Sequence, residues 1–262
     1  MSLFRTKIII SLQRVNMLRK GDLDKIAKYH VSKDEGGFIH GWSKVSRRLM
    51  DERFSIIQKH SVGDTALEIG FADGNLTENL VKFFKNVVAI DGSKFYCNRV
   101  KEIIKSKNLE VVETIYEDYK GKDKFHTIVL SHIIEHVENP GHLLEWSKER
   151  LKRDGVIIII TNSTGSLHRH MGTKLGILKS PEDFTEYDKK LGHKILFNYQ
   201  SLNGLLISKG LNIKAKGGFY LKMLSNIQVE QQWTDEMIEA SIALGYDFPE
   251  IAAEIFFVAG RG

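Results

Sequence analysis

The sequence is poor in cysteine and has no long hydrophobic run. Its 262 residues include a single cysteine, Cys97, which excludes an intrachain disulfide and a zinc cluster built from thiolates. The longest apolar stretches, such as residues 156–160, have the length of a strand, so no membrane-spanning helix is predicted. The apolar run near the N-terminus is interrupted by Gln13 and Arg14 and lacks a small-residue cleavage site, which argues against a secretory signal. We therefore expect a cytoplasmic protein.

Strong charge of either sign is also absent. Lys and Arg number 38 and Asp and Glu number 33, which gives a formal net charge of +5. Lys and Arg do not gather into a compact run with interleaved aromatic residues, so we predict neither a nucleic-acid nor a membrane partner. A hydrophobic content of 42% is ordinary for a globular protein, and the length suits one large α/β domain with a cap. The oligomeric state stays open.

From residue 65 onward, short apolar segments alternate with amphipathic ones. The apolar segments predict strands at 65–70, 86–90, 109–115, 125–131, 155–161, 211–219 and 253–259. The amphipathic segments predict helices at 76–84, 94–106, 140–152, 199–209 and 234–244. This alternation favours a doubly wound, mostly parallel sheet. We expect a helical N-terminal cap over residues 1–60 and a main domain over 61–262, with insertions at about 162–198 and 224–248.

The segment ALEIGFADGNLT at residues 66–77 combines a buried strand, a turn of small residues and the start of a helix. Glycine allows a sharp turn and the close approach of a ligand, and such a strand end is where α/β sheets bind nucleotides. A dinucleotide-binding fingerprint would need glycines at 70, 72 and 75, but this chain has Ala72 and Asn75. An NAD-dependent oxidoreductase is therefore disfavoured.

Three further residues come directly after predicted strands. Asp91 lies 91 − 70 = 21 residues after Gly70, a spacing at which a carboxylate accepts hydrogen bonds from both ribose hydroxyls of a nucleotide. It could instead cap the helix that starts near Lys94. After the third strand, Asp118 is a candidate for the adenine amino group with Tyr119 near the ring. Glu117 and a solvated acidic loop are the alternatives there.

Glu68, Gly70, Ala72 and Gly74 form an acidic-x-Gly-x-small-x-Gly pattern that resembles the first motif of class I S-adenosylmethionine-dependent methyltransferases. The segment HIIEHVENP at 132–140 resembles the branch of that family that includes the ubiquinone-biosynthesis enzymes, the methyltransferase type 11–12 group. The resemblance covers roughly residues 60–165. It departs at His126, where the family usually carries Asp.

The resemblance implies a Rossmann-like α/β fold with a seven-stranded, mostly parallel sheet whose last strand is antiparallel, with an inserted lid. It also implies S-adenosylmethionine as cofactor and S-adenosylhomocysteine as product. A carboxylate at Glu68 suits the cationic amino end of that cofactor. The implied cofactor-binding residues are Glu68, Gly70, Ala72, Gly74, Asp91, Gly92, Asp118, Tyr119 and Ser131.

The insertion at 162–198 is polar and carries three histidines, and its six Lys and Arg against four acidic residues give 6 − 4 = +2. We expect it to form a substrate lid, with a solvated loop as the alternative. Histidine titrates near neutral pH and suits a general base, for which the candidates are His136, His168 and His193. The candidate substrate-binding residues are Tyr29, Trp42, His132, Arg169 and Tyr220.

His132, Glu135 and His136 also match the inverted zinc-protease motif, which would place two histidines on one helix face. The motif here begins at the end of a strand, beside the cofactor motifs, and we predict no metal. The favoured hypothesis is an enzyme that transfers a methyl group to oxygen or nitrogen of a small, anionic metabolite. Nucleotide-linked, phosphorylated, surface-polysaccharide or secondary-metabolite precursors are the acceptor classes considered. The alternative is a catalytically silent scaffold or sensor that binds the cofactor.

Overall fold

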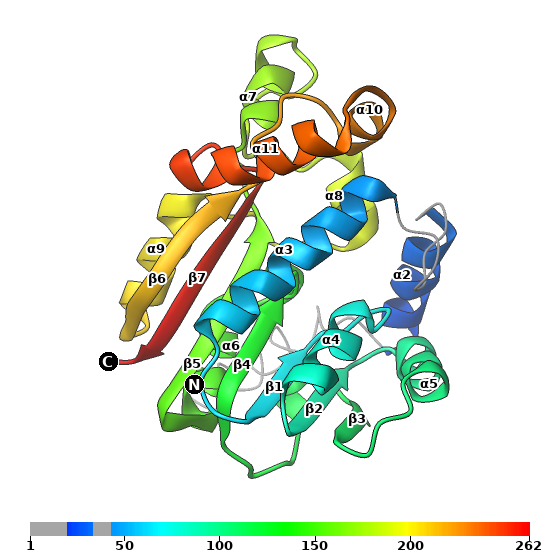
Figure 1. Ribbon diagram of the computed structural model, residues 1–262, viewed down its shortest axis with the longest axis vertical. Helices are drawn as coiled ribbons and strands as arrows, with labels where there is room; N and C mark the ends of the chain where they lie inside the picture. Colours follow the sequence, from blue (N-terminus) through cyan, green and yellow to red (C-terminus); the bar gives the residue numbers. More distant parts are fainter. Residues whose placement is uncertain (1–19, 34–42) are drawn as a thin grey trace, which may run out of the picture.

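The computed structural model describes residues 20–33 and 43–262, and their strands form one seven-stranded sheet (Figure 1). The strands are β1 (Thr65–Ile69), β2 (Asn86–Asp91), β3 (Leu109–Glu113), β4 (Phe125–Ser131), β5 (Leu151–Asn162), β6 (Leu211–Phe219) and β7 (Glu254–Arg261). Their order across the sheet is β3-β2-β1-β4-β5-β7-β6, and β7 runs antiparallel to both of its neighbours. The predicted Rossmann-like sheet with an antiparallel last strand is confirmed.

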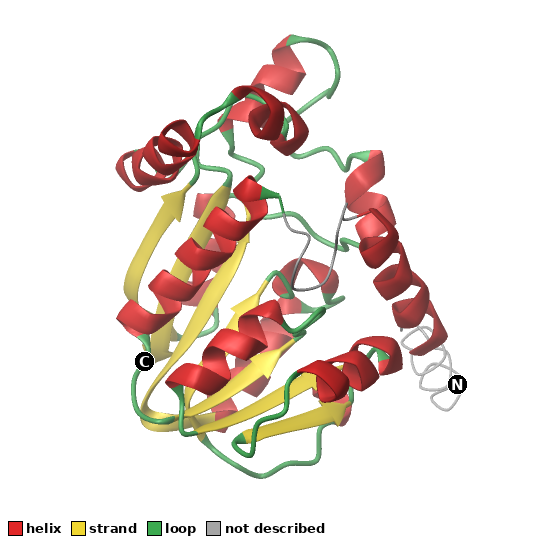
Figure 2. Ribbon diagram, turned by 45° about the vertical axis from the view of Figure 1, so that its right-hand side comes forward, coloured by secondary structure: helices red, strands yellow, loops and turns green. Residues whose placement is uncertain are grey.

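Helices cover both faces of the sheet (Figure 2). They are α2 (Lys20–Lys33), α3 (Lys44–His60), α4 (Asn75–Phe83), α5 (Lys94–Ile103), α6 (Pro140–Arg150), α7 (Leu167–Lys174), α8 (Glu186–Leu191), α9 (Tyr199–Ser208), α10 (Asn226–Gln232) and α11 (Asp235–Asp247). Two short 3-10 turns, η1 (Tyr116–Asp118) and η2 (Ile134–His136), follow β3 and β4. Apolar residues of α3, α4 and α11 pack on one face of the sheet, and those of α6 and α9 pack on the other.

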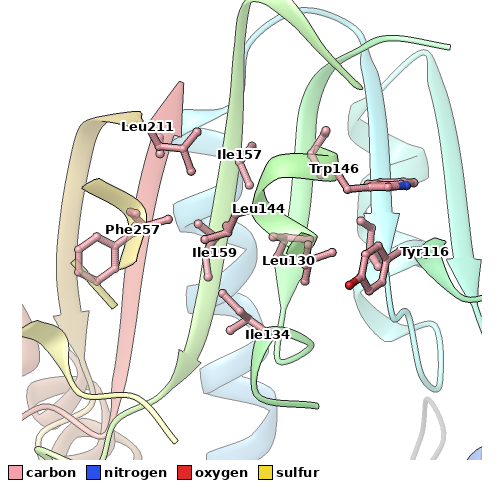
Figure 3. Close-up of a cluster of buried hydrophobic side chains, with 14 of the residues drawn as sticks. Tyr116, Leu130, Ile134, Leu144, Trp146, Ile157, Ile159, Leu211 and Phe257 are labelled. Carbon is pink, nitrogen blue, oxygen red and sulfur yellow. The ribbon is translucent and has the colours of Figure 1, made fainter. Parts of the chain in front are cut away.

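The central strand β5 shows why the sheet needs both layers. Its side chains alternate between the faces, so Ile157 and Ile159 pack with Leu144 and Trp146 of α6 (Figure 3). The intervening residues join the opposite cluster, and they are Val156, Ile158 and Ile160. Burying each of these side chains contributes roughly 1.5–3 kcal/mol relative to leaving it exposed. A continuous apolar run is therefore what a strand covered on both faces requires.

The insertions lie beyond the carboxyl ends of the strands. Helices α7 and α8 fall within the predicted 162–198 insertion, and α10 and α11 fall largely within the second one. Helices α7, α10 and α11 gather at the end of the molecule toward which β5 and β6 run (Figure 1). Helix α2 contacts both α5 and α8. It therefore joins the first half of the sheet to the insertion at 162–198, which we call the lid segment. The division into cap, main domain and lid stays a prediction.

Two local predictions were incomplete. Strand β5 begins at Leu151 rather than at residue 155, because Leu151 pairs with Phe125 before a register shift in the β4–β5 ladder. Helix α10 was not anticipated, because its sequence NIQVEQQ is polar and buries only Val229. No helix in residues 20–33 and 43–262 is long and apolar enough to cross a bilayer.

Candidate active site

The turn between β1 and α4 is held in a left-handed backbone conformation at three of its residues. Gly70 has φ +74°, Ala72 has φ 47° and Gly74 has φ 84°. A side chain at Gly70 would place its Cβ 2.6 Å from Cδ1 of Ile133, which follows β4. Small residues are therefore required here both by backbone conformation and by the closeness of the neighbouring strand end.

Asp91 joins the end of β2 to this turn. Its carboxylate accepts hydrogen bonds from the backbone N–H of Ala72 at 3.1 Å and from that of Ser93 at 2.8 Å. Each carboxylate oxygen has two acceptor sites, so Asp91 keeps capacity for the ribose hydroxyls that the sequence analysis assigned to it. Cofactor binding by Asp91 stays a prediction, and its place at the β1–β2 edge supports it.

Glu68 lies beneath the turn, where its carboxylate accepts a hydrogen bond of 2.7 Å from the hydroxyl of the buried Thr77 in α4. Burial raises the pKa of Glu68 to about 8, and the charges of Asp91 and Asp73 add to this effect. Burial likewise raises the pKa of Asp91 to about 6. Three acidic side chains thus lie close together, which makes this strand edge favourable for a positively charged ligand.

Helix α2 covers the residue after Asp91. A Cβ added to Gly92 would lie 2.5 Å from Cδ1 of Leu23 and 2.9 Å from Cγ2 of Ile115. Asp24, the next residue of α2, accepts hydrogen bonds from the Ser93 hydroxyl at 2.6 Å and from the Phe95 N–H at 3.1 Å. The sequence analysis missed Leu23 and Asp24, because nothing in the local pattern ties α2 to β2.

The other residues predicted for the cofactor lie in different surroundings. Asp118 is exposed in η1, and Ser131 is half-buried at the end of β4. The ring of Tyr119 faces α6, with its centroid 6.1 Å from that of Trp146 and 6.0 Å from the guanidinium of Arg150. Adenine recognition by Asp118 and Tyr119 stays a prediction, and these contacts of Tyr119 are contacts with the core.

A buried ionic network lies at the carboxyl end of β4. His132, with φ 52°, places Nδ1 3.2 Å from Oε1 of Glu135 and Nε2 3.1 Å from Oε2 of Glu254. Arg53 of α3 donates to both oxygens of Glu254, at 2.8 and 2.5 Å. Two carboxylates that face both ring nitrogens favour the imidazolium form of His132, in which both nitrogens donate. Burial works against this charge, but Glu254 and Glu135 outweigh it and raise the pKa of His132.

A second group of polar side chains lies where the lid segment meets β6. Nδ1 of His168 is buried and has no hydrogen-bond partner among the described residues. Burial and the charge of Lys222 lower the pKa of His168 to about 3, so its imidazole is neutral. Burial also lowers the pKa of Lys222 to about 8. The ammonium of Lys222 donates to Asn226, which also accepts from the Tyr220 hydroxyl at 3.1 Å.

The remaining candidate histidines meet at a third point. His136 and His193 pack edge to face, with ring centroids 4.8 Å apart and an interplanar angle of 76°. Nδ1 of His193 lies 3.0 Å from Oδ1 of Asp188. Backbone N–H groups of Lys194 and Ile195 both donate to the Glu135 carbonyl, so the lid segment is tied to η2.

The predicted substrate-binding residues do not form one group. The guanidinium of Arg169 is bonded within the lid, to the Pro181 and Asp183 carbonyls and to Oδ2 of Asp188. Tyr29 is half-buried on α2, and Trp42 lies outside the described residues. His132 and Tyr220 belong to the two groups described above. Arg53 and Glu254 were missed, because no local motif marks them.

The family model for a methyltransferase domain matches residues 42–215, which is more than half of the chain. The chain belongs to this methyltransferase family. A curated relative, the ubiquinone biosynthesis O-methyltransferase of Pelagibacter ubique, is 26% identical over 161 residues. That match covers 56% of this chain and 66% of the relative, so the methyltransferase chain spans slightly less than two thirds of the relative's length.

Solved structures share the fold of this methyltransferase chain. A methyltransferase from Thermotoga maritima superposes with a TM-score of 0.63 at 15% identity, covering 92% of this chain and 100% of its own. The N-methyltransferase NodS from Bradyrhizobium japonicum, in complex with S-adenosyl-L-homocysteine, superposes with a TM-score of 0.58 at 12% identity. That comparison covers 91% of this chain and 98% of NodS. The predicted cofactor, S-adenosylmethionine, is confirmed by family and fold.

The residues present fit this cofactor. Its sulfonium and amino groups are cationic, and the β1–β2 edge carries Glu68, Asp73 and Asp91 in mutual electrostatic contact. Burial raises the pKa of Glu68 and of Asp91, and a bound cation would favour their ionised forms. Gly70, Ala72 and Gly74 occupy the left-handed positions of the turn, and these small residues permit the close approach of a ligand to the backbone.

Proposed function

We propose that this chain transfers a methyl group from S-adenosylmethionine to an oxygen or nitrogen of a small, anionic metabolite. The cofactor supplies an electrophilic methyl group on a sulfonium. The acceptor atom forms a bond to that methyl group, the bond from methyl to sulfur breaks, and S-adenosylhomocysteine is the product. The side chains of this protein must align the acceptor, compensate its charge and take its proton where it carries one.

The observation that carries the proposal is the buried ammonium group of Lys222, whose hydrogen-bond acceptor is the neutral Asn226. Lys222 is buried, and the carboxylate in electrostatic contact with it is that of Glu254. Glu254 is already bonded to Arg53 and His132, whereas Lys222 donates to the neutral Asn226. An anionic group on the acceptor would compensate Lys222, because buried charges are stabilised by a partner of opposite sign.

This group adjoins the cofactor turn. Arg53 interacts electrostatically with Asp73 of the β1–α4 turn as well as with Glu135. The acidic cofactor side and the basic acceptor side are therefore neighbours at the carboxyl edge of β1 and β4. Such an arrangement supports in-line transfer between a cation and an anion held side by side.

We assign the base to His168. It is neutral, its buried Nδ1 lacks a partner, and it lies within the electrostatic reach of Lys222. Lys222 suppresses protonation of His168 in the free protein. An acceptor anion bound to Lys222 would weaken that effect and make the imidazole a better proton acceptor when the substrate is in place.

The test is a methyl-transfer screen of phosphorylated and nucleotide-linked metabolites, phenols and amines with the parent protein, Lys222→Met and Lys214→Met. Lys214 is an exposed lysine of β6 and serves as the matched control. Loss of a hydrogen bond to a charged group costs about 1.5–3 kcal/mol, which corresponds to a rise in acceptor KM of roughly 10–100-fold for Lys222→Met. Added salt should lower activity on the anionic acceptor by screening.

Lys214→Met should retain the parental KM. Preferred methylation of a neutral or cationic acceptor, without a salt effect and with an unchanged KM in Lys222→Met, would contradict the assignment of an anionic substrate.

A further inference from the structure

Three side chains from two separate parts of the chain converge beside the acceptor end of the site. Glu135 and His136 lie in η2, directly after β4, and His193 lies after α8 in the lid segment. Their potential ligand atoms all lie within 4.8 Å of one another. None of these three was needed for the cofactor edge or for the Lys222 and His168 group.

The orientation of His193 is fixed by a carboxylate. Its Nδ1 lies 3.0 Å from Oδ1 of Asp188, which leaves Nε2 as the other nitrogen of the ring. Asp188 is held in turn, because its Oδ2 accepts from the Thr185 N–H at 2.8 Å, from the Thr185 hydroxyl at 2.7 Å and from Arg169 at 3.3 Å. A carboxylate on the far nitrogen of an imidazole is the usual arrangement around metal-binding histidines.

Glu135 offers an oxygen that the protein itself does not use. The side chain is 2% exposed, and its Oε1 is bonded to Nδ1 of His132 at 3.2 Å. Its Oε2 is buried and has no hydrogen-bond partner among the described residues. A buried carboxylate oxygen without a donor is costly, and a cation at this place would satisfy it.

The two imidazoles approach each other as ligands of one ion would. The rings of His136 and His193 are 4.8 Å apart and nearly perpendicular, and the backbone bonds from Lys194 and Ile195 to the Glu135 carbonyl hold the lid segment at this distance. The sequence analysis rejected a metal because the segment 132–136 lay at a strand end. The third ligand comes 193 − 136 = 57 residues later, from the lid.

We propose that Glu135, His136 and His193 bind one divalent transition-metal ion of the zinc or cobalt type. Two imidazoles and one carboxylate suit such ions, and three protein ligands leave a coordination position for water or an acceptor oxygen. Because His193 belongs to the lid segment and the other two ligands to the core, the ion would also fasten the lid to the sheet.

The test uses the full chain, freed of metal with a chelator and titrated with Co²⁺ and then Zn²⁺. We expect one Co²⁺ per chain, with the visible absorption of a four- or five-coordinate site, and its displacement by Zn²⁺. X-ray absorption of the Co²⁺ form should show two imidazole ligands. His193→Gln and Glu135→Gln should weaken binding at least about tenfold. His170→Gln alters an exposed histidine of α7 and should bind as the parent does.

These measurements do not involve methyl transfer, so they test the metal site independently of the proposed function. Circular dichroism checks that each variant is folded. If a variant is not folded, the metal titration and X-ray absorption of the parent protein still test the site. Absence of stoichiometric binding to the parent, binding without imidazole ligands, or equal affinity in folded His193→Gln and Glu135→Gln would overturn the proposal.

Discussion

The two halves of the carboxyl edge of this sheet differ in electrostatic character. At the ends of β1 and β2, burial raises the pKa of Glu68 and of Asp91, and the charges of Asp91 and Asp73 add to the effect on Glu68. Near the carboxyl ends of β4 and β6, Arg53 and Lys222 place positive charge beside Glu135 and Glu254, and burial lowers the pKa of Lys222. In each half, a bound ligand of opposite charge would therefore stabilise the buried ionised groups.

The difference supports the ligand proposed for each half. Carboxylates that resist ionisation suit a cationic cofactor, and a buried ammonium without a carboxylate bonded to it suits an anionic acceptor. Arg53 and Asp73 lie at the boundary, where the two halves interact. Substitutions in one half at a time test this contrast.

The largest effect is expected on the acceptor side, in His168→Gln. Glutamine retains polarity but cannot accept the proton, so kcat should fall about 10²–10⁴-fold while the affinity for S-adenosylhomocysteine stays near the parental value. The measurement is kcat beside the Kd for S-adenosylhomocysteine. His170→Gln, on the same helix, is the control and should keep the parental kcat. A near-parental kcat in His168→Gln would remove His168 as the base and leave His136 or His193 to be tested.

On the cofactor side, Glu68→Gln should change how stability depends on pH. Burial raises the pKa of Glu68 from 4.5 to about 8, so between these values the folded protein keeps a proton that the unfolded chain has released. The free energy of unfolding of the cofactor-free protein should therefore fall as pH rises from 4.5 to 8. Glutamine removes this contribution, which amounts to roughly 3–5 kcal/mol over the whole range.

Urea denaturation of parent and variant at several pH values measures the difference directly. Glu102→Gln, at an exposed residue of α5, should leave the pH dependence unchanged. An identical slope in parent and Glu68→Gln would show that Glu68 is ionised in the folded protein, and the electrostatic contrast between the two halves would lose its main support.

The smallest expected effect is a difference in affinity for S-adenosylhomocysteine between variants at two acidic residues of the cofactor half. Asp91→Ala removes the acceptors of the Ala72 and Ser93 N–H groups together with the predicted ribose bonds, so affinity for S-adenosylhomocysteine should fall roughly 10–100-fold. Asp118 is exposed, and Asp118→Ala should cost less than about 1 kcal/mol of binding free energy. Calorimetric titration measures both. Equal losses, or no loss in Asp91→Ala, would contradict the assignment.

Much of the fold could be predicted from the sequence, because its signals are local. Alternation of apolar and amphipathic segments predicted the strands β1 to β4 within two residues, and the spacing from Gly70 to Asp91 predicted that these residues meet at one edge. Contacts within a strand–helix–strand unit follow from chain geometry, since parallel neighbours place their carboxyl ends together. The cofactor was predicted from the resemblance of the motif Glu68, Gly70, Ala72 and Gly74 to that of class I methyltransferases.

The acceptor half was decided only by tertiary structure. Arg53 and Glu254 are 201 residues apart, and their ion pair forms because α3 packs on the face of the sheet that β7 completes. The lowered pKa of Lys222 and the neutral imidazole of His168 result from burial, which no spacing in the sequence specifies. By itself the sequence determined the sheet, the turn and the cofactor edge. The docking of α3 and the lid segment decided which cations and imidazoles lie beside that edge. Burial and charge compensation arise only when distant segments pack together.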